Sequence, residues 1–368
     1  MKSKMGRILK LSAAVFALAL PLFGQGNATF FRVVSPTNSE ITAFSDGTLV
    51  WTNAATEGVT CVVQRADTLI GPDNWVDYVQ HEATNDVMTL RLFDLTPPLD
   101  MVYIPAGSFS MGDNLDEATN ALPVHSVYVS GFYMSKYEVT KALWDEVYTW
   151  AVSNGYSFTN VGFCKTSNHP VQTVSWYDTV KWCNARSEKE GLTPCYTVSG
   201  NIYRTGDSDP DCNWSANGYR LPTEAEWEKA ARGGLSGKRF PWGDTIQHTK
   251  ANYSNDVSYS YDTSSTFGYH PTYAVGSPPY TSPGGSFLPN GYGLYDMAGN
   301  VREWCWDRYD SAYYASSPSL NPRGASTGTS HVRRDGSYRN DPEYCRSSDR
   351  LWGSPDTAYV TLGFRVAR

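Results

Sequence analysis

The 368-residue chain has few charged residues and no long hydrophobic run. Charged residues make up 18% of the sequence, and the longest apolar run, LSAAVFALALPLF, has about 13 residues, fewer than the roughly 20 that a membrane-spanning helix needs. Four basic residues precede this run and the small residues GQGNA follow it, the pattern of a cleaved secretory signal. We therefore predict a signal peptide at residues 1–28 and an exported protein (periplasmic, cell-surface or secreted) without a membrane span after cleavage; a retained anchor is the alternative.

The chain also lacks an excess of basic residues. Its formal net charge is −7, and residues 1–28 contain four basic residues and no acidic one, so their removal leaves a net charge of about −11. A protein this acidic does not attract nucleic acid or anionic membranes. The composition therefore excludes nucleic acid as an expected partner.

The motifs of several enzyme classes are missing. The sequence contains no HExxH, no GxSxG and no CxxC, and GGLSGKR is one residue short of a phosphate-binding loop and lacks its Ser or Thr. The six histidines are scattered singly, so we interpret each as structural or solvent-exposed. A Ser–His–Asp triad assembles from distant residues, but no pattern indicates one.

Turn-forming and aromatic residues are abundant instead. The chain has 31 Gly and 21 Pro, and aromatics reach 14%, which favours many turns and a core filled by rings. Short β-branched and aromatic runs separated by turn clusters predict a small all-β, sandwich-like module at residues 29–97. TPPLD, residues 96–100, reads as a linker to an α+β domain at residues 98–368.

Three segments of that domain are predicted to be helical. KALWDEVYTWAVSNG has Leu143, Trp144, Val147 and Ala151 spaced for one face, and SWYDTVKWCNARSEKEG begins at a good N-cap, Ser175. LPTEAEWEKAARGG has the spacing of a capping box and a Gly-Gly stop. The long stretch from FPWGD to FLPNG has no such pattern, so aromatic packing or a bound ion must hold it.

The seven cysteines leave two questions open. An odd count leaves at least one unpaired within the chain, and our best pairing is Cys195 with Cys212. Cys183 fits a helix face and is expected to be a small buried hydrophobe. Cys345 lies beside Arg346, so it is either a reactive thiol with a lowered pKa or a half-cystine that pairs with Cys305.

GYGLYDMAGNVREWCWD is a candidate metal site. Asp296 and Glu303 flank a Gly-Asn turn, and an oxygen-rich turn between two carboxylates suits calcium. In the alternative, Asp296 caps a turn and Glu303 pairs with an arginine such as Arg302.

Several motifs occur together in a fixed order across residues 101–368. They are MVYIPAGSFSMGD, FYMSKYEVT, HPVQTVSWYDTVKWCN, YRLPTEAEWEKAARGG, FPWGD, NGYGLYDMAGNVREW, RDGSY and GFRVAR. In this combination the chain resembles the formylglycine-generating enzyme, or sulfatase-modifying factor, family. The resemblance implies an α+β fold, a variant of the C-type lectin fold with little regular secondary structure. It does not cover residues 29–97.

The resemblance also implies metal sites. Calcium ligands of the family would fall on the Asp296 and Glu303 side chains and on the Gly299 and Val301 carbonyls. A second calcium site would include Asn252 and the Tyr253 carbonyl.

The oxidases of the family bind copper through two cysteines and convert a sulfatase cysteine to formylglycine. Here Cys345 matches the second cysteine, but the first falls on Asn340, and Asp335 replaces the first glycine of the GGS[YW] motif. Copper is therefore expected only if the protein is an oxidase, with Cys345 catalytic.

Another branch of the fold binds ligands only, through variable residues near the C-terminus. RNDPEYCRSSDRLWGSPDTAY resembles such a recognition surface, and its candidate contact residues are Arg339, Asn340, Glu343, Tyr344, Trp352 and Tyr359. In the alternative, Arg346, Arg350 and Arg365 hold the fold through buried ion pairs, and Trp352 packs in the core. The sequence thus predicts a calcium-stabilised binding scaffold for a protein, peptide or glycan, or for a sulfatase; the alternative is a formylglycine-generating oxidase.

Overall fold

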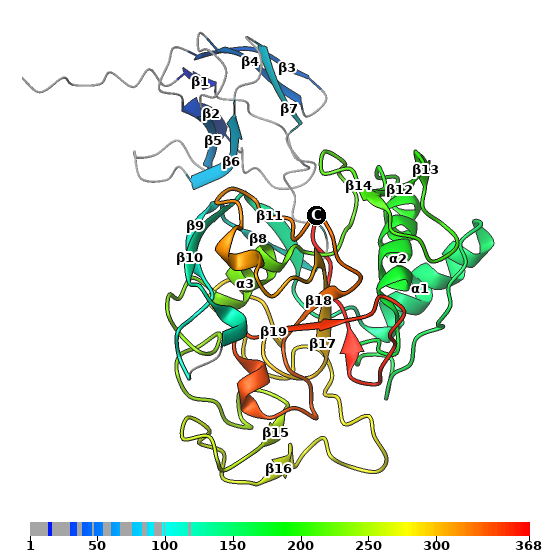
Figure 1. Cartoon of the computed structure of the whole chain (residues 1–368). Coiled ribbons are helices and arrows are strands. Elements are labelled where there is room, and N and C mark those ends of the chain that lie inside the picture. Colours follow the sequence, from blue (N-terminus) through cyan, green and yellow to red (C-terminus); the bar gives the residue numbers. More distant parts are fainter. Residues whose placement is uncertain are drawn as a thin grey trace, which may run out of the picture. The chain divides into compact units, whose positions relative to one another are not determined.

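The computed structural model describes strands between residues 14 and 91, residue 98, and residues 100–116 and 119–368 (Figure 1). The chain divides into two units, residues 1–96 with 105–107 and residues 97–104 with 108–368. Most of the predicted linker at 96–100, all but residues 98 and 100, and most of the predicted signal peptide lie outside the described residues. No helix in these ranges is long and apolar enough to cross a membrane.

The first unit contains two antiparallel sheets. One has the order β1 (Ala14–Phe16), β2 (Phe30–Val34), β5 (Thr60–Ala66) and β6 (Val76–Glu82); the other has β3 (Ser39–Ser45), β4 (Thr48–Asn53) and β7 (Val87–Arg91). Strands β2, β4, β5, β6 and β7 form in the runs ATFFRVVS, GTLVWTN, VTCVVQRA, WVDYVQH and VMTLRLFD, on which the prediction of a β module at residues 29–97 rests. β3 was not predicted, and the residues of β1 fall in the predicted signal peptide, which stays a prediction.

The second unit has short strands joined by long irregular segments. Its largest sheet has the order β19 (Arg350–Gly353), β18 (His331–Arg334), β17 (Arg302–Arg308) and β20 (Leu362–Gly363), with only the β17–β20 pair parallel. Two two-stranded sheets pair β8 (Met101–Ile104) with β11 (Phe132–Ser135) and β9 (Gly107–Met111) with β10 (His125–Val129). Smaller sheets contain β12 (Tyr196–Val198), β13 (Asn201–Ile202) and β14 (Asp211–Cys212), and β15 (Ser254–Asn255) with β16 (Gly268–Tyr269). The α+β class is therefore confirmed, while the lectin-like variant stays a prediction.

Helices form at the three predicted segments. They are α1 (Lys141–Ser153), α2 (Trp176–Lys189) and α3 (Glu224–Arg232). The Thr223 hydroxyl accepts a hydrogen bond from the Glu226 N–H, and the Glu226 carboxylate accepts one from the Thr223 N–H, so the predicted capping box is present. Gly233 ends α3 with φ of +55°, the left-handed geometry that glycine adopts without strain.

Aromatic rings fill the core of this unit. Trp144 of α1 and Trp182 of α2 stack with ring centroids 6.0 Å apart, and Phe364 meets Trp182 edge-on. The irregular stretch after α3 is held by a separate buried cluster. That cluster comprises Phe240, Ile246, Ala251, Tyr253, Tyr261, Ala298 and Cys345. Aromatic packing therefore holds this stretch, one of the two expected means.

Both disulfides considered from the sequence are absent. The six cysteines from Cys164 onward are free thiols, including Cys195 and Cys212. Cys305 and Cys345 belong to different buried clusters, so they are not positioned as a pair. Cys183 is fully buried, as its helix position predicted.

Candidate functional site

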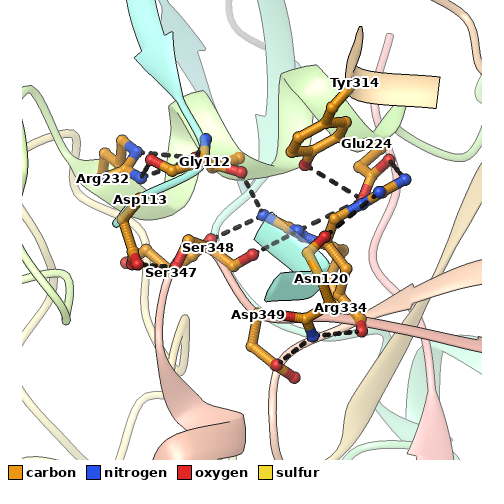
Figure 2. Close-up of polar contacts among 12 residues, drawn as sticks. Gly112, Asp113, Asn120, Glu224, Arg232, Tyr314, Arg334, Ser347, Ser348 and Asp349 are labelled. Carbon is orange, nitrogen blue, oxygen red and sulfur yellow. Dashed lines mark hydrogen bonds and ion pairs between the residues drawn. The ribbon is translucent and has the colours of Figure 1, made fainter. Parts of the chain in front are cut away.

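A buried network of arginines and glutamates fixes the C-terminal segment to α3 (Figure 2). Arg334 of β18 pairs with Glu228 at 2.6 Å and with Glu224 at 3.3 Å, and Arg350 of β19 binds Glu224 through two bonds of 2.6 and 2.9 Å. Arg334 also donates to the carbonyl oxygens of Ser347 and Ser348. Residues 347–350 are thus tied to one rigid helix.

The network extends to the loop after β9. Arg232 pairs with Glu228 at 2.7 Å and donates to the Gly112 carbonyl, while the Gly112 N–H donates to Glu228. Burial opposes ionisation of Glu228, but Arg232 and Arg334 outweigh it, so its pKa is lowered. Asn120 completes this side by donating to Asp349 and to the Arg350 carbonyl. Asn120 and Asp349, which the network joins, both line a cavity.

Cys345 lies behind this segment, in the apolar cluster. Its side chain is fully buried, and burial, followed by the nearby Asp335 and Asp349, raises the pKa of its thiol well above the usual value. A reactive cysteine needs partial exposure and a lowered pKa. The burial and raised pKa disfavour an activated thiol at Cys345, and its sulfur is not paired with Cys305 in this structure.

This environment predicts slow chemistry at Cys345. In the folded protein, iodoacetamide is expected to label the half-buried Cys164 at least about tenfold faster than Cys345, because alkylation requires an accessible thiolate. Peptide mass mapping after timed labelling measures both rates. Equal rates in native buffer would contradict the burial of Cys345, and equal rates in denaturant provide the control.

Asn340, at the position of the first family cysteine, closes a turn. Its side-chain oxygen accepts hydrogen bonds from the Ser337 N–H at 3.0 Å and the Ser337 hydroxyl at 2.6 Å, and its carbonyl accepts from Ser254. The Asn340 side chain therefore stabilises this turn, and it is less available for ligand contact than its sequence position indicated.

A cavity of about 580 Å³ adjoins the segment that contains Cys345. Its charged lining residues are Asp116, Glu343, Arg346 and Asp349, and its tyrosines are Tyr259, Tyr261 and Tyr344. The Tyr261 hydroxyl and Asp349 Oδ2 are buried without a hydrogen-bond partner. Buried polar atoms are rarely left unsatisfied, but these two atoms have almost no accessible surface, so they do not themselves face the cavity.

The structure brings together only part of the predicted recognition surface. Glu343 and Tyr344 line the cavity, and Arg339 is exposed. Trp352 and Tyr359 have exposed fractions of 55% and 57%, so the alternative that Trp352 packs in the core is wrong. The alternative for the arginines is confirmed, since Arg346, Arg350 and Arg365 all form buried ion pairs.

The sequence analysis missed part of the cavity. Asp116 follows β9, and Tyr259 and Tyr261 come from the tyrosine-rich stretch that had no helical or strand pattern. These segments are more than 80 residues from the C-terminal segment, and no short-range motif links them. Only the density of tyrosines in YSYDTSSTFGYHPTY signalled a binding or packing role.

The two predicted calcium segments lie against each other. The Asn252 carbonyl accepts a hydrogen bond from the Asn300 N–H at 2.7 Å, and a Cβ added to Gly299 would come within 2.3 Å of it. Gly299, with φ of +90°, is therefore required for this approach. Asn252 Oδ1 is buried without a partner, which fits an oxygen ligand, while the Tyr253 ring packs near Cys345.

The two predicted carboxylate ligands differ in their availability. Asp296 accepts one bond from the Gly285 N–H and keeps Oδ1 buried without a partner. Burial raises the pKa of Asp296 to about 6. An unpartnered buried carboxylate oxygen fits a calcium ligand.

Glu303 is engaged elsewhere. Its two oxygens accept bonds from the Arg365 guanidinium at 2.7–2.9 Å and from the Trp227 indole N–H at 2.6 Å. The Arg365 Nε–H is shared between the two oxygens, so three N–H groups already bind this carboxylate, and its capacity to ligate calcium is reduced. The partner is Arg365 rather than the suggested Arg302, because neighbouring residues of β17 point to opposite faces.

Among the described residues, no group of three or more His, Cys, Asp or Glu side chains has metal-binding geometry. The Val301 N–H donates to Glu138, which leaves the Val301 carbonyl oxygen out of that bond. A calcium site would use the Gly299 and Val301 carbonyl oxygens together with Asp296. Calcium binding stays a prediction.

One protein family matches most of the chain. Residues 93–368 match the family described as "Sulfatase-modifying factor enzyme 1-like domain". The chain is 33% identical to the formylglycine-generating enzyme of Bos taurus over 299 residues, which are 74% of this chain and 75% of that protein. It is 34% identical to chaperone protein LppX of Paenibacillus barcinonensis over 225 residues, 56% of this chain and 71% of that one.

Solved structures agree with the sequence comparisons. Treponema denticola variable protein 1 superposes with a TM-score of 0.57 at 30% identity, covering 73% of this chain and 94% of that one. PvdO from Pseudomonas aeruginosa gives a TM-score of 0.55 at 26% identity, covering 75% and 97%. Proteins named as an enzyme, a chaperone and a variable protein therefore share this fold.

Proposed function

Because the chain belongs to the family of sulfatase-modifying factor enzyme 1-like domains, we propose that it is an exported binding scaffold without oxidase chemistry. Its ligand is a protein, peptide or glycan. The observation that carries this proposal is the environment of Cys345, a solitary, fully buried thiol with a raised pKa.

A two-thiolate copper site does not fit these residues. Copper(I) binds tightly to paired soft thiolates, and the position of the other thiolate holds Asn340, a hard neutral amide committed to Ser337. The buried cluster around Cys345 contains no second cysteine and no methionine. Deprotonating an apolar, buried thiol for a metal carries a large desolvation cost.

The recognition features support binding instead. The cavity of about 580 Å³ has the size of a small-ligand or side-chain pocket, and charged residues and tyrosines line it. Trp352 and Tyr359 add exposed aromatic surface on the same C-terminal segment, and exposed aromatics are typical of recognition surfaces. The chaperone and variable-protein names among similar proteins are compatible with this role.

The second candidate is a formylglycine-generating oxidase with an altered copper site. It is favoured by the 33% identity to the Bos taurus formylglycine-generating enzyme across three quarters of both chains. In that case a sulfatase would be the partner.

Copper(I) titration separates the two candidates. The full chain is titrated against a competing chromophoric chelator under anaerobic conditions, with Cys345→Ser as the matched variant. The binding-scaffold proposal expects no one-to-one complex that survives the chelator and no difference between the two proteins. Stoichiometric copper that is lost in Cys345→Ser would overturn the proposal and establish the altered copper site.

A further inference from the structure

Two arginines lie on one face of the β17–β18 pair without an acidic partner. Trp304 of β17 is directly opposite Arg333 of β18, and directly opposite residues point to the same face. Arg302 is two residues before Trp304, so it points to that face too. The Arg302 guanidinium lies over the Tyr344 ring at 5.5 Å, and that of Arg333 lies over Trp304 at 5.7 Å.

Arg302 and Arg333 are half-buried, and they differ from the more deeply buried arginines of the described residues. Arg220, Arg232, Arg334, Arg350 and Arg365 each form an ion pair with a glutamate.

By contrast, no carboxylate of the described residues is within ion-pair distance of Arg302 or Arg333. The Nε atoms of both are buried without a hydrogen-bond partner. Among the acidic residues, Asp349 has the largest electrostatic effect on the pKa of Arg302, and it forms no ion pair with it.

The charges of the pair are poorly compensated. Burial, followed by repulsion from Arg302, lowers the pKa of Arg333 to about 10, and burial lowers the pKa of Arg302. Even partial burial of a guanidinium without a counter-charge is unfavourable. An anion bound at the accessible side of these half-buried groups would supply the missing negative charge.

The position of Arg333 is also constrained. Its guanidinium donates to the Trp352 carbonyl and rests against Gly353, where an added Cβ would come within 2.8 Å of Cζ. The side chain is therefore held in place by a backbone bond and a glycine rather than by an acid. Exposed Tyr359 lies near enough to influence the charge of Arg333, so the pair borders the recognition surface.

We propose that Arg302 and Arg333 bind an oxyanion of the ligand, the chemistry shared by carboxylate and sulfate groups. Guanidinium groups are suited to this because their planar donors match pairs of anionic oxygens. This proposal deepens the proposed binding function, and it rests on that function in assuming that the protein has a ligand. The ligand would carry an acidic group that binds beside Tyr344.

Inorganic anions test the site without knowledge of the partner. The full chain is titrated with sodium sulfate and, in a second arm, sodium acetate, each against sodium chloride at equal ionic strength, with the thermal midpoint as readout. We expect a saturable rise in the wild type and binding at least about tenfold weaker in Arg302→Met and in Arg333→Met. Sulfate and acetate affinities then tell which oxyanion the site prefers.

Arg323→Met is the matched control, because Arg323 is exposed and lies outside both the pair and the candidate recognition surface. Without anion, Arg333→Met loses the bond to the Trp352 carbonyl but no ion pair, so it is expected to keep a cooperative unfolding transition, which shows that the variant folds. A wild type without a saturable response, or unchanged affinity in both arginine variants, would overturn the site. Neither result depends on the copper titration, so the two proposals fail separately.

Discussion

Replacing Arg334 with methionine is expected to lower the free energy of unfolding by about 3–5 kcal/mol. The Arg334 side chain is completely buried. It forms an ion pair with Glu228 at 2.6 Å and donates hydrogen bonds to the carbonyl oxygens of Ser347 and Ser348. Methionine fills much of the space, but Glu228 then has only Arg232 as an ion-pair partner. The Ser347 and Ser348 carbonyl oxygens lose the donor that Arg334 supplied. Denaturant unfolding followed by tryptophan fluorescence measures the loss, since Trp227 lies 5.2 Å from the Arg334 guanidinium.

Arg308→Met is the control for this prediction. Arg308 also forms an arginine–carboxylate pair, with Asp209 at 2.8 Å, but both side chains are partly exposed. Such surface pairs contribute up to about 1 kcal/mol. If Arg334→Met destabilised the protein no more than Arg308→Met does, the buried network would not be what fixes the C-terminal segment.

Calcium is expected to raise the stability of the wild type and to leave Asp296→Asn unchanged. Asp296 Oδ1 is a buried oxygen without a partner, and a ligand of the folded state at 100 times its dissociation constant stabilises by about 2.7 kcal/mol. Asparagine tolerates the left-handed backbone of position 296, where φ is +53°. Thermal midpoints in chelator and in calcium measure the effect, and Asp356→Asn, at an exposed carboxylate, is the control.

The effect of calcium depends on pH in a defined direction. Burial raises the pKa of Asp296 from its usual 3.8 to about 6, so in chelator the folded state is favoured below about pH 4 and loses stability as pH rises through 6. Calcium needs the ionised carboxylate, so its effect should be full above about pH 7 and should fade as pH falls through 6. A midpoint that ignores calcium at every pH would contradict the calcium prediction.

Local patterns predicted the helices well. Thr223 and Glu226 are three residues apart, and Ser175 directly precedes its helix, so the capping bonds depend on neighbours that the sequence itself fixes. The β-rich runs near the N-terminus were found for the same reason. β3 was missed because its first residues, SE, belong to a cluster that reads as a turn.

Long-range pairings account for what the sequence did not predict. Glu303 pairs with Arg365, 62 residues away, instead of with its neighbour Arg302. Side chains alternate between the two faces of a strand, so Arg302 points away from Glu303. The partner Arg365 could be identified only once the fold was known. Asp349 and Tyr261 meet at the cavity from separate segments. The family resemblance indicated where the candidate metal ligands fall, but not that Arg365 already occupies both Glu303 oxygens.

Oxidation of a sulfatase peptide tests the central claim most directly. The full chain is incubated with copper(I), oxygen and a peptide that carries the sulfatase CxPxR motif, and the peptide mass is followed over time, with Cys345→Ala alongside. A buried, single thiol predicts an unchanged peptide mass with both proteins. Conversion of the peptide cysteine to formylglycine by the wild type, abolished in Cys345→Ala, would contradict the account.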